Sequence, residues 1–206
     1  MQAAGVVSAL IPGVEAPFEP AGICRQPGLS FGLGLHPQYQ GGDGWQNQLA
    51  RGLDDHDAVA VGELGWDRRC GGDLQPARDQ LHIAQARGLP VILHLVGHCS
   101  ELLDAVQDLG LRAQLHRCTG RPSRFRAYWE AGHYISIGPT LRADLRLAKA
   151  VPAKQILLET DAESEADAPW STLPHLYRQV AAAREIPMDA LVDQVRKNYA
   201  TFLGGS

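Results

Sequence analysis

The sequence predicts an α/β fold in which strands alternate with helices, of the TIM-type (β/α) barrel kind. Short continuous apolar runs recur along the chain, and such runs are typical of strands buried on both faces of a parallel sheet. A helical segment follows most of these runs, and strict alternation favours a mainly parallel sheet with right-handed crossovers. The length of 206 residues suits one domain, at the low end for an eight-stranded barrel.

Seven strands are expected, at residues 6–14, 29–35, 58–63, 90–95, 111–116, 134–137 and 155–159. Helices are expected at residues 45–54, 74–87, 99–109, 123–131, 141–150, 171–185 and 188–201. The second helix should end at Gly88, because glycine readily adopts the left-handed conformation found at helix ends. A closed barrel of this type has eight strands, so we predict one barrel domain over residues 1–206 that lacks its first βα unit.

The composition is that of an ordinary globular protein, with 45% hydrophobic and 20% charged residues. A net charge of −4 gives no overall attraction to nucleic acid. The sequence has no apolar run near the roughly 20 residues of a membrane span, and it lacks a secretory signal pattern at its start. Four cysteines without a C-x-x-C pair do not suggest a disulfide scaffold, so a cytoplasmic location is expected.

Four of the apolar runs end in a side chain that can bind a metal ion. These side chains are Glu63, His94, His116 and Asp161. In an α/β barrel the carboxyl ends of the strands meet on the face that carries the active site. Imidazole and carboxylate groups suit divalent ions, so the pattern predicts a metal centre of the hydrolytic kind.

Two further polar residues follow strands on the same face. His36 and Asp67 are expected either to contact a substrate phosphate or to support the metal ligands. Other histidines carry no such pattern: His56, His82, His98 and His133 are expected at the surface, and His175 in a structural role. Tyr128 and Trp129 are expected in the core, and packing is favoured for Cys118.

Several segments together resemble the TatD family of metal-dependent hydrolases, which have an α/β barrel fold and cut nucleic acid. The segment GLHP at residues 34–37 is similar to the family's G-x-H-P, and VGELGWD at 61–67 to its G-E-x-G-L-D. LPVILH at 89–94, HRCTG at 116–120 and LLETDA at 157–162 match three further family motifs, and Asn198 fits the closing one. The resemblance covers essentially the whole chain.

The resemblance implies two divalent metal ions, which would be Mg, Mn or Zn. Glu63 would bridge them, His94 and His116 would serve one ion, and Asp161 would bind the other and orient the attacking water. Glu63 and Asp161 would thus be the catalytic residues. The implied activity is that of a 3′-5′ exonuclease on single-stranded DNA or another phosphodiester.

The sequence also departs from the family pattern. The family's first strand carries D-x-H-x-H, and this chain contains no H-x-H. An absent strand would leave an open edge that an upstream segment or a protein partner would have to cover. Val96 and Gly97 stand where the family often has Arg-Asp, and Arg117, with Arg121 and Arg124 nearby, could supply the phosphate contact instead.

Three alternatives for the function therefore stay open at the level of sequence. The first is a metal-dependent nuclease, and the second is a catalytically impaired family member that acts as a binding or assembly subunit. The third is a hydrolase of C–N bonds in a small substrate, because the same fold hosts unrelated chemistries.

Overall fold

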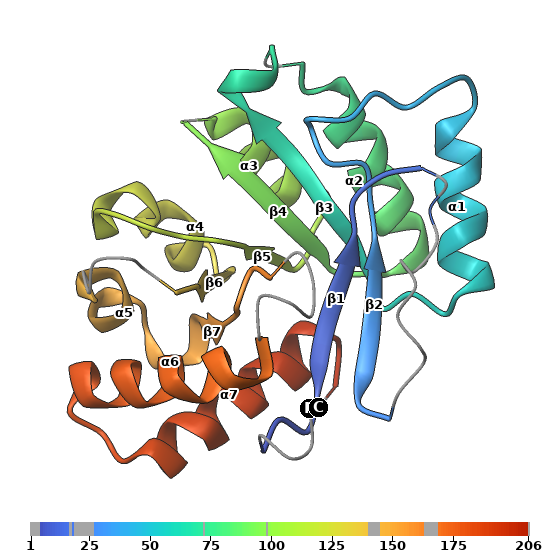
Figure 1. The fold of residues 1–206 in the computed structure, drawn as a ribbon. Coiled ribbons are helices and arrows are strands. Elements are labelled where there is room, and N and C mark those ends of the chain that lie inside the picture. Colours follow the sequence, from blue (N-terminus) through green and yellow to red (C-terminus); the bar gives the residue numbers. More distant parts are fainter. Residues whose placement is uncertain are drawn as a thin grey trace. The chain divides into compact units, whose positions relative to one another are not determined.

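Strands and helices alternate along the chain in the computed structural model, as the sequence predicts (Figure 1). The structure describes residues 5–16, 18, 27–71, 73–97, 99–139, 145–162 and 169–205. The chain forms two compact units. We call Ser8–Gln114 the N-terminal unit and Leu115–Ser206, together with Met1–Val7, the C-terminal unit.

The N-terminal unit is built on four parallel strands that lie side by side in chain order. They are β1 (Ala9–Gly13), β2 (Leu29–Leu33), β3 (Ala60–Asp67) and β4 (Val91–Val96). Parallel neighbours need long crossover connections, and helices lie in those from β2 to β3 and from β3 to β4. β5 (Ala113–Leu115) lies at the junction of the two units in the sequence.

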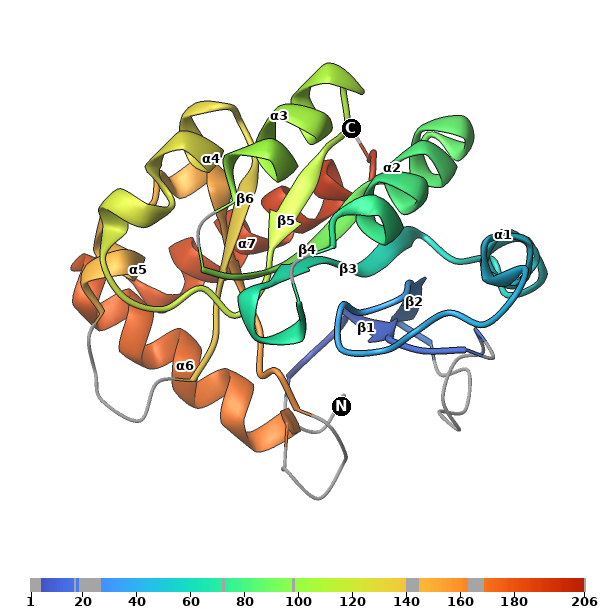
Figure 2. The same cartoon turned by 90° about the horizontal axis from the view of Figure 1, so that it is seen from above.

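Helices cover these strands and complete the N-terminal unit, and they can be followed in the second view (Figure 2). α1 (Trp45–Asp55) packs on β2 and α2 (Gln75–Arg87) packs on β3. The short η2 (Arg68–Cys70) and α3 (Ser100–Asp108) follow β3 and β4. α2 ends at Gly88 in the left-handed conformation, with φ of 64°, which confirms the predicted helix stop.

The C-terminal unit holds β6 (Tyr134–Ile137) parallel to β7 (Ile156–Leu158). Its helical elements are η3 (Pro122–Arg124), α4 (Arg126–Glu130), α5 (Arg146–Ala150), η4 (Ala153–Gln155), α6 (Pro169–Arg184) and α7 (Met188–Phe202). Both α6 and α7 pack on β7, and they also pack on each other.

Asn198 fastens α7 to the start of β7. Its side chain is only 4% exposed, and its Nδ2 donates hydrogen bonds of 2.8 Å to the carbonyl oxygens of Ala153 and Ile156. The ring of Phe202 lies edge-on to that of Tyr134, with centroids 5.6 Å apart. Buried polar groups usually have hydrogen-bond partners, and the Asn198 amide is the partner of the Ala153 and Ile156 carbonyl groups.

Several sequence-based boundaries differ from the structure. β3 runs on to Asp67 and β4 to Val96, so Glu63 and His94 lie within strands and do not end them. The predicted helix at 123–131 is two short elements, η3 and α4, and residues 141–144 of another lie outside the described residues. The helix bounds elsewhere agree to within a few residues.

The expectation of a surface position for His133 is wrong. The turn at Gly132 directs the chain into β6, and His133 enters the interior there with 6% of its surface exposed. Tyr128 and Trp129 are buried, which confirms their predicted place in the core. No helix in the described part of the chain combines the length and apolar character needed to cross a bilayer.

We predict that Asn198→Ala lowers the free energy of unfolding by about 2–3 kcal/mol, because two buried carbonyl groups lose their donor. Urea unfolding followed by circular dichroism measures the change. Asn47→Ala is the matched control, because Asn47 is exposed on α1 and should cost about 0.5 kcal/mol or less. Equal losses in the two variants would contradict the role assigned to Asn198.

Candidate metal site

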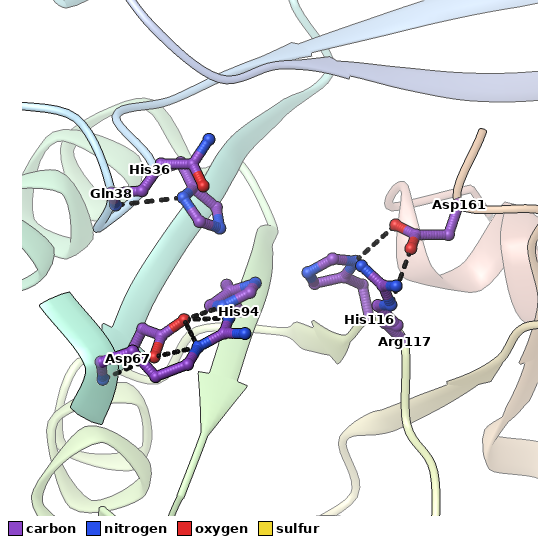
Figure 3. Close-up of polar contacts among 8 residues, drawn as sticks. His36, Gln38, Asp67, His94, His116, Arg117 and Asp161 are labelled. Atoms are coloured by element: carbon purple, nitrogen blue, oxygen red, sulfur yellow. Dashed lines mark hydrogen bonds and ion pairs between the residues drawn. The ribbon is translucent and has the colours of Figure 1, made fainter. Parts of the chain in front are cut away.

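Three side chains of the N-terminal unit form a group that could hold a metal ion. One donor atom from each of His36, Glu63 and His94 lies within 4.8 Å of the other two. The two histidines are 7% exposed, and their ring centroids are 4.1 Å apart with the rings at 70° (Figure 3). Two imidazoles and a carboxylate at this separation fit the ligands that Zn²⁺ and Mn²⁺ accept.

Glycines allow the strands to approach closely at this group. The register between β3 and β4 shifts on either side of Glu63, an irregularity that can re-aim a side chain. Gly65 is aligned with His94, and a Cβ there would lie 2.1 Å from the His94 carbonyl oxygen. A Cβ at Gly34 would lie 2.6 Å from the Cα of Gly62. Only glycine fits at these approaches.

A buried glutamine holds the backbone next to His36. Gln80 of α2 is 0% exposed, and its Oε1 accepts a 2.7 Å hydrogen bond from the Leu35 N–H. Its Nε2 donates to the Leu35 carbonyl at 3.0 Å. The amide therefore satisfies both polar groups of the residue that precedes His36, and it links α2 to the segment after β2.

The hydrogen bond to His36 fixes which ring nitrogen carries the proton. The Gln38 N–H donates to His36 Nδ1 at 3.1 Å, so Nδ1 has its lone pair there and Nε2 carries the proton of the neutral ring. Burial, with a further contribution from His94, lowers the pKa of His36 to about 4. His36 is therefore a neutral N–H donor at neutral pH, which suits contact with a phosphate oxygen better than metal ligation.

Asp67 lies behind His94 and orients it. Its carboxylate, 1% exposed, is 3.2 Å from His94 Nε2 and accepts hydrogen bonds from the backbone and guanidinium of Arg69 (Figure 3). The Arg69 guanidinium holds the pKa of Asp67 well below its usual range, against the effect of burial. A charged carboxylate can only accept, so His94 Nε2 donates and the lone pair of its ring lies on Nδ1.

This arrangement bears on the two roles that the sequence leaves open for Asp67. A buried carboxylate engaged by Arg69 and His94 is a supporting group for a ligand and is poorly placed to meet a substrate phosphate. Arg69 and Gln80 carry no motif that singles them out in the sequence. The one local signal for Arg69 is its place two residues after Asp67 in a tight turn.

The C-terminal unit brings together three other predicted site residues. His116 directly follows β5 and is buried, and its Nδ1 is 3.6 Å from Asp161 Oδ1. Arg117, 67% exposed, places its Nε 2.9 Å from Asp161 Oδ2 (Figure 3). Arg117 and Asp161 both have left-handed backbones, with φ of 50° and 52°, which is uncommon for residues other than glycine.

Glu159, which was not among the predicted site residues, contacts this group at Arg117. Its carboxylate accepts a hydrogen bond from the backbone N–H of Arg117. Burial raises the pKa of Glu159 to about 7. The residue lies in the LLETDA segment, so the motif itself was the signal that could have pointed to it.

Comparison with known families and structures gives one consistent result. A family model described as "TatD related DNase" matches residues 22–204 and thus reaches into both units. No curated protein sequence matches the chain.

Solved structures show the same fold. YJJV, a TatD homologue from Escherichia coli K12, has a TM-score of 0.81 at 22% identity, over 98% of this chain and 88% of that one. A TatD family hydrolase from Entamoeba histolytica has a TM-score of 0.82 at 16% identity, over 98% and 86%. A dihydroorotase has a TM-score of 0.63 at 16% identity, over 98% and 62%. These matches confirm the predicted fold class, an α/β fold of the TIM-barrel type.

We predict that Asp67→Asn weakens zinc binding about 10- to 100-fold, because His94 loses the charged acceptor that orients its ring. Competition titration against a chelator measures the affinity. Asp104→Asn is the matched control, since Asp104 is exposed on α3. An unchanged affinity in Asp67→Asn would rule out the supporting role.

We further predict a pH-dependent stability that His36 causes in the metal-free protein. With a pKa of about 4 folded against 6.5 unfolded, the unfolded chain binds more protons between these values. Stability therefore falls as the pH drops from 6.5 toward 4, by about 3 kcal/mol at most. Urea unfolding at a series of pH values should show a shallower dependence of stability on pH in His36→Asn than in the wild-type protein, and an equal dependence in the two proteins would contradict the prediction.

Proposed function

Since the chain belongs to the TatD-related DNase family, a family of metal-dependent hydrolases, we propose that it hydrolyses phosphodiester bonds and removes nucleotides from the 3′ end of single-stranded DNA. The main support is the group formed by His36, Glu63 and His94, with Asp67 behind His94. A carboxylate, an oriented imidazole and a neutral N–H donor are the groups that a phosphodiesterase needs around a metal ion.

Glu63, His94, His116 and Asp161 are proposed as the metal ligands, as the family motifs imply. Divalent ions held there would supply Lewis-acid stabilisation of the charge that develops on the phosphate, and would lower the pKa of a bound water. The chain's own residues supply the remaining steps. Asp161 would orient the attacking water through its carboxylate, and Glu63 would be a ligand shared by both ions.

His36 and Arg117 are proposed to hold the substrate phosphate. The Nε2–H of neutral His36 can donate to a non-bridging oxygen without adding a charge to the site. Arg117 is exposed and its guanidinium forms the charge-assisted bonds that phosphate favours. In the structure its partner is Asp161, so a phosphate would compete with that ion pair.

We predict that the protein degrades single-stranded DNA when Mn²⁺ or Zn²⁺ is present and stops when a chelator removes the ion. Glu63→Gln and His94→Ala should each lower the rate at least about 100-fold, because each removes a proposed ligand. The measurement is release of nucleotides from a 3′-labelled oligonucleotide. His175→Ala, on the exposed surface of α6, is the control and should keep the wild-type rate.

The same assay separates the alternatives. No hydrolysis of DNA, RNA or a small phosphodiester by a folded, metal-loaded protein would favour the impaired family member that acts as a binding subunit. Turnover of a cyclic amide without turnover of any phosphodiester would favour the C–N hydrolase. Metal loading of each variant, measured by mass spectrometry, shows whether a lost rate reflects a lost ion.

A further inference from the structure

A cavity of about 340 Å³ lies beside His36 within the N-terminal unit. The segment that follows β2 lines it with Tyr39 and Gln40, and the segment that follows β3 lines it with Cys70 and Asp73. His36 belongs both to this lining and to the candidate metal group. Crevices outside the carboxyl ends of parallel strands are where α/β proteins bind their ligands.

The charges that line the cavity disfavour a phosphate in its interior. The described lining residues include the carboxylates of Asp67 and Asp73, and none of them is a lysine or an arginine. Asp67 is already paired with Arg69, whereas Asp73 is exposed. An anionic ligand would meet the negative charge of exposed Asp73 and no lining lysine or arginine, so the cavity suits a neutral group.

The size and the aromatic lining of the cavity favour a single ring system. At about 340 Å³, the cavity is at the small end of ligand pockets, so it suits one ring system better than an extended chain. Trp45 is 8% exposed, and a Cβ at Gly41 would lie 2.3 Å from its Cγ, so backbone already covers that ring. Tyr39 is only half-buried, and its ring lies 6.3 Å from that of His36 with the two planes at 68°, so it is the more accessible of these two aromatic rings.

We propose that this cavity binds the base of the nucleotide whose phosphate is hydrolysed, with the base stacked on Tyr39. This inference rests on the proposed function. In a nucleotide, the sugar joins the base to the phosphate. His36 belongs both to the cavity and to the metal group, so a base in the cavity would have its phosphate near that group. The exposed amide of Gln40 offers both a donor and an acceptor to the edge of a base. Stacking on an aromatic ring tolerates any base, as an exonuclease requires.

Cys70 provides a direct readout of binding, because it lines the cavity and is exposed, whereas Cys99 and Cys118 are buried. The metal-free protein is alkylated with N-ethylmaleimide, and modification of Cys70 is followed by peptide mass spectrometry. We expect deoxyadenosine and thymidine to slow this modification until it saturates. Deoxyribose 5-phosphate and inorganic phosphate, which lack a base, should not slow it. Protection by the sugar phosphate as strong as that by the nucleosides, or no protection by either nucleoside, would overturn the inference.

Tyr39→Ala tests the stacking partner. The nucleoside concentration needed for protection should rise about 5- to 100-fold, the range found when a stacking aromatic is removed. Tyr39→Phe retains the ring and should restore protection near the wild-type concentration. Unchanged protection in Tyr39→Ala would remove Tyr39 from the site. The wild-type comparison of nucleosides with deoxyribose 5-phosphate decides the main question even if the alanine variant fails to fold.

Because protection needs neither metal nor turnover, failure of this inference is distinct from failure of the proposed function. Nucleoside protection in a protein that cleaves no phosphodiester would support the cavity assignment and refute the nuclease. Cleavage of DNA without any nucleoside protection would refute the cavity assignment and support the nuclease.

Discussion

The close approach of β2, β3 and β4 is the constraint on which the rest of the N-terminal unit depends. It exists only because Gly34, Gly62 and Gly65 lack a side chain where neighbouring backbone lies too near for any Cβ. Gly62 and Gly65 also adopt φ of 147° and 151°, which favours glycine for a second reason. This packing brings donor atoms from three strands or strand ends within 4.8 Å of each other. A side chain at Gly65 would push β3 away from β4 at His94. The group of His36, Glu63 and His94 would then be lost although all three side chains were still present.

Hydrogen-bond partners then give the two neighbouring histidines different chemistry. His36 accepts a bond at Nδ1 from a backbone N–H, which leaves a proton on Nε2. His94 donates from Nε2 to the charged Asp67, which leaves a lone pair on Nδ1. One ring can therefore donate to an anion while the other can donate electrons to a cation, although both are buried imidazoles in the same group. Both residues are histidines, so the residue type does not decide between these roles. The hydrogen-bond partner of each ring decides.

The sequence predicted most of the fold and only part of the site's geometry. Alternation of apolar runs with helices predicted a mainly parallel sheet, and Gly88 predicted the end of α2, because both depend on local pattern. The extension of β3 past Glu63 was missed, because the apolar run that predicted the strand stops at Glu63. His133 shows a second limit, because its burial is set by the turn that precedes β6. Gln80 could not be found at all, since a glutamine in an amphipathic helix shows no sign of a partner 45 positions away.

The distribution of charge bears on the proposed polyanionic substrate, because the chain as a whole has a net charge of −4. In the C-terminal unit, Arg117, Arg121 and Arg124 are exposed in the segment after β5 and offer guanidinium groups to phosphates. The cavity of the N-terminal unit has the opposite character, since its described lining has carboxylates and no cationic side chain. A nucleotide likewise has one charged part and one neutral part: its phosphate carries the negative charge, and its flat base is neutral. Local placement of charge matters more here than the total, because screening limits each charge to its neighbourhood of about 8–10 Å.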